Sequence, residues 1–283
     1  MKQSTPKLYL QIGNQDEIEV GDITNNLRFL GDDYNPTITN SYQENTGQDG
    51  SDFNIATFNK SVITARFWLH FTTWNDYKMA KSEIYNTLMT KDLIRYRTDV
   101  EPAKVKYVRV TTFQIQPTED YAHDCLFTIA FDNPSGCSYS LYPSNQLYKY
   151  SAESWQYGMN LPIPVGKLNY NFVDETNIYV FNAGIDIDPY MQKHDLKIIM
   201  KRYGNQSFGL VNNTTNTSWN YHGSLGLNDT LILDGINTYK NGITDNLNSD
   251  YGYLMLAHGW NNISITGVKD LDVTFSFPFI YLA

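Results

Sequence analysis

Residues 61–88 read SVITARFWLHFTTWNDYKMAKSEIYNTL, and the spacing of their apolar side chains changes at about residue 72. In the first part, every second side chain is apolar: Ile63, Ala65, Phe67, Leu69 and Phe71. This period of two predicts a strand with one buried face. The opposite face is mixed in character and carries Val62, Thr64, Arg66, Trp68 and His70. We therefore expect it to be only partly covered.

The second part of the stretch predicts the main helix of the chain. Its apolar residues recur at helical spacing: Tyr77, Ala80, Ile84 and Leu88. Thr73 or Asn75 can cap the helix, and Asp76 favours the positive end of the helix dipole. The N-terminal half is thus expected to combine one helix with strands.

Working outward, we expect a hairpin over 7–20 and strands over 92–99, 105–115 and 125–131. The polar, glycine-containing stretch 37–52 predicts a long loop. The pattern breaks at FDNPSGCSYSLYPS, residues 131–144, which contains two prolines and a glycine. We place a domain boundary there, giving domains 1–141 and 142–283.

From residue 176 onward, short strand patterns alternate with turns, which is typical of a β-sandwich. The end of the chain reads LAHGWNNISITGVKDLDVTFSFPFIYL, residues 256–282. There we expect a strand over 253–256, a turn over 259–262 and a long alternating strand over 271–281, forming a closing hairpin. Pro278 lacks a donor and is expected at a sheet edge or where pairing ends.

Composition and charge argue against several classes of function. The net charge of −9 gives no general attraction to nucleic acid. No apolar run is long enough to span a membrane, and the N-terminus lacks a signal-like apolar segment. The two cysteines, Cys125 and Cys137, do not have metal-ligand spacing and are expected to be free thiols.

Motifs for catalysis are scarce. The five histidines show no metal-ligand spacing, and we expect no cofactor. Asp186 and Asp188 resemble a carboxylate pair for acid–base chemistry, but solvated aspartates are usual before a proline such as Pro189. We therefore expect a protein without enzymatic activity. Candidate contact residues for a sugar or a protein partner are Trp155, Trp219, Tyr221 and Trp260.

Several segments, in this order, resemble the distal tail proteins of long-tailed phages that infect Gram-positive bacteria. In the first half these are GQDGSDFNIATFNKSVITARFWLHF (47–71), the helix, and strands ending at TIAFDNPSG (128–136). In the second half they are IYVFNAG (178–184), LKIIMKRYGNQSFGLVNNTT (196–215), YHGSLGLNDTLILDG (221–235) and LAHGWNNISITG (256–267). The resemblance implies an N-terminal belt domain, a β-sandwich with a helix, and a C-terminal galectin-like β-sandwich.

The resemblance also implies a function in the virion. Such proteins form a hexameric ring at the tail tip, assembled in the host cytoplasm, that joins the tail tube protein to baseplate, fibre, lysin or receptor-binding proteins. DNA passes through the ring without specific binding, and nothing inserts into a membrane. Ring closure needs a heterologous interface, for which Arg66, Trp68 and His70 are candidates from their position on the mixed strand face.

Two other functions stay open at this stage. One is a carbohydrate-binding module that recognises host glycans through the aromatic residues between 155 and 260. The other is a hydrolase of cell-wall polymers, with Asp186 and Asp188 as its suggestive pair.

Overall fold

The structure is a computed structural model that describes residues 5–146, 155–162 and 168–282. The chain divides into two compact units. Unit 1 comprises residues 1–138 with 282–283, and unit 2 comprises residues 139–281. The division lies within the proline- and glycine-containing segment 131–144.

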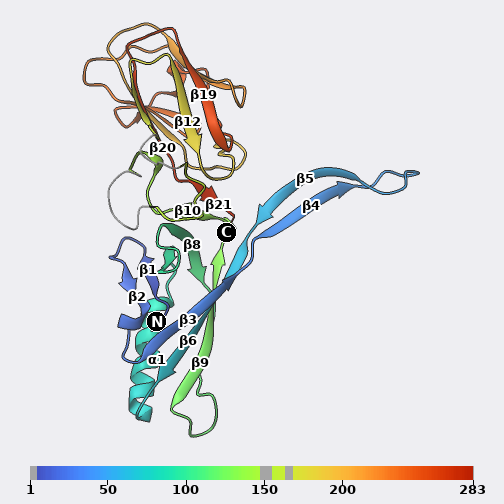
Figure 1. Ribbon diagram of the computed structural model, residues 1–283, viewed down its shortest axis with the longest axis vertical. Coiled ribbons are helices and arrows are strands. Elements are labelled where there is room, and N and C mark those ends of the chain that lie inside the picture. Colours follow the sequence, from blue (N-terminus) through green and yellow to red (C-terminus); the bar gives the residue numbers. More distant parts are fainter. Residues whose placement is uncertain (1–4, 147–154, 163–167, 283) are drawn as a thin grey trace. The chain divides into compact units, whose positions relative to one another are not determined.

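Unit 1 is built on one antiparallel sheet with the strand order β2-β1-β7-β8-β9-β6-β3 (Figure 1). The strands are β1 (Leu8–Ile12), β2 (Ile18–Glu19), β3 (Leu27–Tyr34), β6 (Ser61–His70), β7 (Ile94–Thr98), β8 (Lys104–Val110) and β9 (Asp124–Asn133). A short 3₁₀ helix, η1 (Val20–Asp22), follows β2. The hairpin predicted over 7–20 is confirmed as β1 and β2.

Strand β6 is the strand predicted from the period of two, and it pairs with β3 on one side and β9 on the other. Its inward residues Ile63, Ala65, Phe67 and Leu69 are almost completely buried in the core of the unit. Phe67 stacks on Phe127 of β9 with ring centroids 5.5 Å apart. The outward residues stay partly or wholly exposed, as the mixed pattern predicted.

Helix α1 (Trp74–Leu88) begins where the sequence predicted it. Thr73 and Asp76 form a capping box, in which each side chain accepts a hydrogen bond from the other residue's backbone N–H. The four residues predicted to be buried, Tyr77, Ala80, Ile84 and Leu88, all belong to the core. Tyr77 and Tyr85 also donate their hydroxyls to the carbonyls of Ile115 and Phe113.

The stretch predicted as a long loop is instead most of a hairpin. Strands β4 (Thr37–Gln43) and β5 (Asp52–Asn59) pair with each other in a two-stranded sheet of their own. Neither strand has a buried face, and the few apolar residues of the two strands do not alternate strictly with polar ones. Cross-strand backbone hydrogen bonds hold the hairpin together in place of a core.

Unit 2 contains a six-stranded and a four-stranded antiparallel sheet. The six-stranded sheet has the order β11 (Asn171–Val173), β20 (Asp272–Ser276), β13 (Lys197–Lys201), β16 (Leu231–Asp234), β17 (Asn237–Lys240) and β18 (Ile243–Thr244). The four-stranded sheet has the order β12 (Asn177–Asn182), β19 (Gly259–Thr266), β14 (Phe208–Asn212) and β15 (Thr217–Tyr221). Buried Trp219 of β15 donates to Thr238 of β17, joining the two sheets as a sandwich.

Shorter elements complete the unit. They are β10 (Ser138–Ser140), whose first residue still belongs to unit 1 and which pairs with β21 (Ile280–Tyr281), and the 3₁₀ helices η2 (Ser144–Gln146) and η4 (Asn246–Asn248). The protein is thus mainly β, with one α-helix among the described residues, as predicted. No helix in these ranges is long and apolar enough to cross a membrane.

The predicted closing hairpin is wrong in three respects. Residues 259–262 do not form a turn but begin β19, and β19 and β20 lie in different sheets. Of the strand predicted over 253–256, only Leu256 makes a bridge, to Ile187. The long final strand is divided into β20 and β21, and Pro278 lies in the break between them, where pairing ends as predicted.

The physical reason for the first error is the environment of Asn261. Its side chain is completely buried, and it bonds to backbone groups of Ala257 and Gly259 and to the side chain of Asn212. Because these bonds satisfy the Asn261 amide inside the protein, the residue does not have to lie in a solvent-exposed turn. Its strand position therefore overrides the turn preference of Gly-Trp-Asn-Asn.

We predict that Thr73→Ala lowers the free energy of unfolding by about 1 kcal/mol, because the first turn of α1 loses its cap. Chemical denaturation monitored by circular dichroism measures this. Thr72→Ala is the matched control, because Thr72 is exposed and lies outside the cap. Equal losses in the two variants would contradict a capping role.

A second prediction concerns Glu17, which accepts hydrogen bonds from Arg95 and from the nearly buried Arg97. Burial alone would raise the pKa of the Glu17 carboxyl, but these two guanidinium groups outweigh burial and lower it. The folded pKa therefore lies below the unfolded one, so the stabilisation is present above about pH 4.5 and is lost as the pH falls through the folded pKa.

Glu17→Gln should thus lower the free energy of unfolding at pH 7 by about 1.5–3 kcal/mol, with the difference shrinking toward pH 3. Urea denaturation across this pH range measures it. Glu19→Gln removes the more exposed Lys7–Glu19 pair and should cost clearly less than Glu17→Gln. A Glu17→Gln effect that does not vary with pH would show that the charge is not responsible.

Candidate assembly surface

The β4–β5 hairpin is the part of unit 1 with the least internal support. All of its residues are exposed except Asn59 at its base, which is half-buried. Figure 1 shows the two strands continuing past the ends of β3 and β6. A long exposed ribbon with unpaired edges is a surface on which another chain readily pairs or packs.

The two faces of the hairpin differ in character. Cross-strand pairing places Ile38 opposite Phe58 and Tyr42 opposite Phe53, so these four side chains share one face. The rings of Tyr42 and Phe53 meet edge to face at 5.9 Å. The other face has Ile55 opposite Ser41, among threonines. The hairpin is therefore amphipathic, and its apolar face lacks a cover.

The base and tip of the hairpin are fixed by local contacts. At the base, Thr37 donates to the carbonyl of Lys60, whose ammonium pairs with Asp132 at 3.0 Å. Gly136 lies against Asn59 with a φ of +66°, and an added Cβ would overlap the Asn59 carbonyl oxygen. At the tip, Asn45 donates to Asp52. These contacts attach the base of the hairpin to the neighbouring residues of unit 1 and stabilise its tip.

The three ring-interface candidates all lie on the outward face of β6. Trp68 stacks on His70 with ring centroids 5.8 Å apart, and the Arg28 guanidinium lies 5.1 Å from the Trp68 ring. His70 contacts Asp124 at 2.9 Å, and Arg66 lies 3.8 Å from Asp33. The structure brings these side chains onto one partly exposed surface, and their role at an interface stays a prediction.

Two of the four contact candidates in unit 2 are removed by burial. Trp219 and Tyr221 are 0% exposed and pack around Phe208 in the core. Tyr221 donates its hydroxyl to Asp245, and burial raises the pKa of that hydroxyl. Both rings fill the sandwich, so neither reaches a ligand at the surface. Trp155 and Trp260 are 42% and 50% exposed and stay available.

The suggestive carboxylate pair is engaged by the backbone. Asp186 accepts a hydrogen bond from the backbone N–H of His258, and Asp188 accepts from those of Tyr190 and Met191. The bonds of Asp188 are those of a turn-stabilising aspartate, whereas Asp186 bonds to a segment distant in the sequence. Within the described ranges, no group of three histidine, cysteine or acidic side chains is placed to hold a metal ion.

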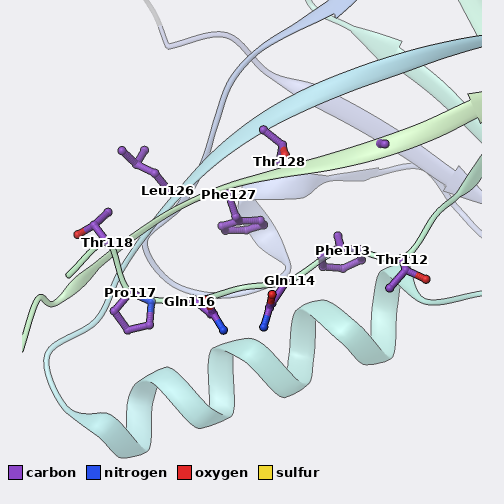
Figure 2. A pocket seen from close by; sticks show the side chains of 10 residues that line it. Thr112, Phe113, Gln114, Gln116, Pro117, Thr118, Leu126, Phe127 and Thr128 are labelled. Atoms are coloured by element: carbon purple, nitrogen blue, oxygen red, sulfur yellow. The ribbon is translucent and has the colours of Figure 1, made fainter. Parts of the chain in front are cut away.

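An open pocket of about 640 Å³ lies between β9 and the extended segment 112–118 (Figure 2). This segment includes residues 111–115, which the sequence assigned to a strand that in fact ends at Val110. The lining residues are threonine, glutamine, proline, alanine, leucine and phenylalanine, without a titratable group. The pocket therefore offers no acid, base or thiol for catalysis. Nothing in the sequence pattern singled it out.

Comparisons with known proteins agree with this architecture. Residues 13–132 match the family of the phage tail protein RIFT-related domain. The fold is similar to that of the Dit protein (gp 19.1) of phage SPP1, with a TM-score of 0.65 and 10% identity, covering 96% of this chain and 99% of that one. That structure is described as a paradigm of the hub adsorption apparatus in phages infecting Gram-positive bacteria.

A weaker similarity links the chain to a component of the phage p2 baseplate, with a TM-score of 0.46 and 9% identity over 97% of this chain and 98% of that one. No curated protein gives a significant sequence match. The SPP1 match extends through both units of the chain. Residues 13–132 thus resemble the phage tail protein RIFT-related domain, and the chain as a whole has a fold similar to that of SPP1 Dit.

Proposed function

We propose that the protein is a structural component of a phage virion, a hub at the distal tip of the tail. In this role six copies form a ring that joins the tail tube protein to baseplate, fibre, lysin or receptor-binding proteins. The observation that carries the proposal is the β4–β5 hairpin, whose apolar face is not covered by any residue that the structure describes. The tail-protein domain and the similarity to SPP1 Dit support the same role.

The hairpin suits a ring because its counterpart must be a different surface on the next copy. A contact between two unlike surfaces is heterologous, and it closes into a ring when the rotation between copies permits. Residues 1–141 would thus act as the ring-forming domain. The outward face of β6, with Arg66, Trp68 and His70, is the candidate seat, because its aromatic stack can pack on the apolar face of the hairpin.

The remaining parts of the chain fit this role. Residues 142–283 would form the galectin-like domain that docks neighbouring tail proteins. The net charge of −9 suits a ring through which DNA passes, because acidic walls do not bind phosphate groups. We assign no catalytic step to the protein and place it in the tail tip of the virion, assembled in the host cytoplasm.

The proposal is tested by the mass of the protein in solution, using light scattering on a sizing column and negative-stain images of the same fraction. We expect six-fold rings with a central channel. A strict monomer at all protein concentrations and salt conditions would overturn assembly of the ring by this chain alone.

Ile38→Ser tests the apolar face of the hairpin, and Ile55→Ser is its matched control. The two isoleucines are 57% and 52% exposed, on opposite faces of the same ribbon. Burial of an isoleucine contributes about 1.5–3 kcal/mol, so Ile38→Ser should weaken assembly tenfold or more. Ile55→Ser should change it little. Equal effects, or none, would show that this face is not the contact.

Hydrogen exchange followed by mass spectrometry gives an independent prediction. In the monomer, amides of β4 and β5 should exchange much faster than those of β6 and β9, because a ribbon without a core opens easily. In assembled rings the hairpin amides should become protected. Unchanged exchange in the ring would exclude the hairpin from the interface.

A further inference from the structure

The outer face of the four-stranded sheet in unit 2 carries an unusual set of side chains. Along β12 and β19, both labelled in Figure 1, one set of alternate residues is buried: Ile178, Val180, Asn182, Asn261, Ile263 and Ile265. The intervening residues therefore point away from the core. They are Asn177, Tyr179, Phe181, Trp260, Asn262 and Ser264, and we call them the aromatic–amide face.

Aromatic rings occupy one end of this face. Phe181 and Trp260 are cross-strand partners, with ring centroids 5.1 Å apart and planes inclined at 60°. Trp260 is half exposed. Tyr179, two residues before Phe181 on β12, is 57% exposed. The π surface of such a ring is electronegative and attracts polarised C–H groups.

Uncharged polar groups occupy the rest of the face. Ser264 donates to the amide oxygen of Asn177 at 3.1 Å, and Asn262 lies opposite Tyr179. The side-chain oxygen of Asn262 is buried but has no hydrogen-bond donor in the described structure. An amide with an unsatisfied oxygen gains a bond if its side chain turns toward a ligand hydroxyl.

We propose that the aromatic–amide face binds a neutral carbohydrate. A pyranose ring presents C–H groups on one face, which can stack on Trp260. The hydroxyls at its edge can form hydrogen bonds with the side chains of Asn262, Asn177 and Ser264. None of the six side chains carries a charge, which favours a neutral sugar over an acidic one. The proposal is independent of ring formation, because the whole face belongs to one subunit.

The test uses the full chain on a printed array of neutral and acidic oligosaccharides, followed by calorimetric titration with the neutral oligosaccharide that binds best. Trp260→Ala should weaken binding at least tenfold, Asn262→Ala should weaken it severalfold, and Trp260→Tyr should retain most of it. Tyr203→Ala is the matched control, because Tyr203 is a 69% exposed aromatic residue next to the other sheet and should leave binding unchanged.

Three results would overturn the proposal: no neutral glycan bound at millimolar concentration, selective binding of acidic glycans, or binding that Trp260→Ala and Asn262→Ala leave intact. Light scattering on the same samples keeps the two proposals distinguishable. Rings that bind no glycan would refute this sugar site and support the tail hub. Glycan binding by a strict monomer would support the sugar site and count against ring formation by this chain alone. Asn262→Ala carries the test if Trp260→Ala fails to fold, since the side-chain oxygen of Asn262 has no hydrogen bond to lose.

Discussion

The two-sided pairing of β6 is the constraint on which unit 1 depends. Because β3 and β9 both hold this strand in register, its apolar residues must face the core and its mixed residues must face outward. The same register positions helix α1, whose apolar side packs into the core that β6 lines. A slip of one residue would bury Arg66 and expose Phe67, which is why a strand with this pattern permits one arrangement only.

The hairpin is a continuation of the same pairing beyond the core. Tyr34 at the end of β3 pairs with Ile63, and Thr37 at the start of β4 pairs with Asn59, so the ribbon extends the β3–β6 pair. Past this point no other part of the described chain covers either face of the strands. Natural proteins usually protect such edges with charge or proline. Between Thr37 and Asn59 in the two strands, only Asp52 is charged, which is consistent with a surface kept for assembly.

In unit 2 the main constraint is the burial of three asparagine side chains inside the β-sandwich, where each amide needs hydrogen-bond partners. Asn182, Asn212 and Asn261 are all completely buried. Asn212 donates to Asn261 and to the carbonyl of Met255, Asn261 donates to the carbonyl of Ala257, and Asn182 donates to the carbonyls of Ile185 and Leu256. This network fixes the entry of β19 into the four-stranded sheet. It thereby directs Trp260 and Asn262 outward, where the aromatic–amide face is exposed.

The sequence by itself determined the elements that have a clear inside and outside. The period of β6, the cap and apolar face of α1, and the short strands of unit 2 were predicted because burial imposes a regular pattern on them. Tertiary structure alone decided the hairpin, the strand at Gly-Trp-Asn-Asn and the burial of Trp219 and Tyr221. A ribbon with no buried face leaves no period to detect. The place of an asparagine or an aromatic ring depends on partners that are distant in the chain, such as Asn212 for Asn261 and Thr238 for Trp219.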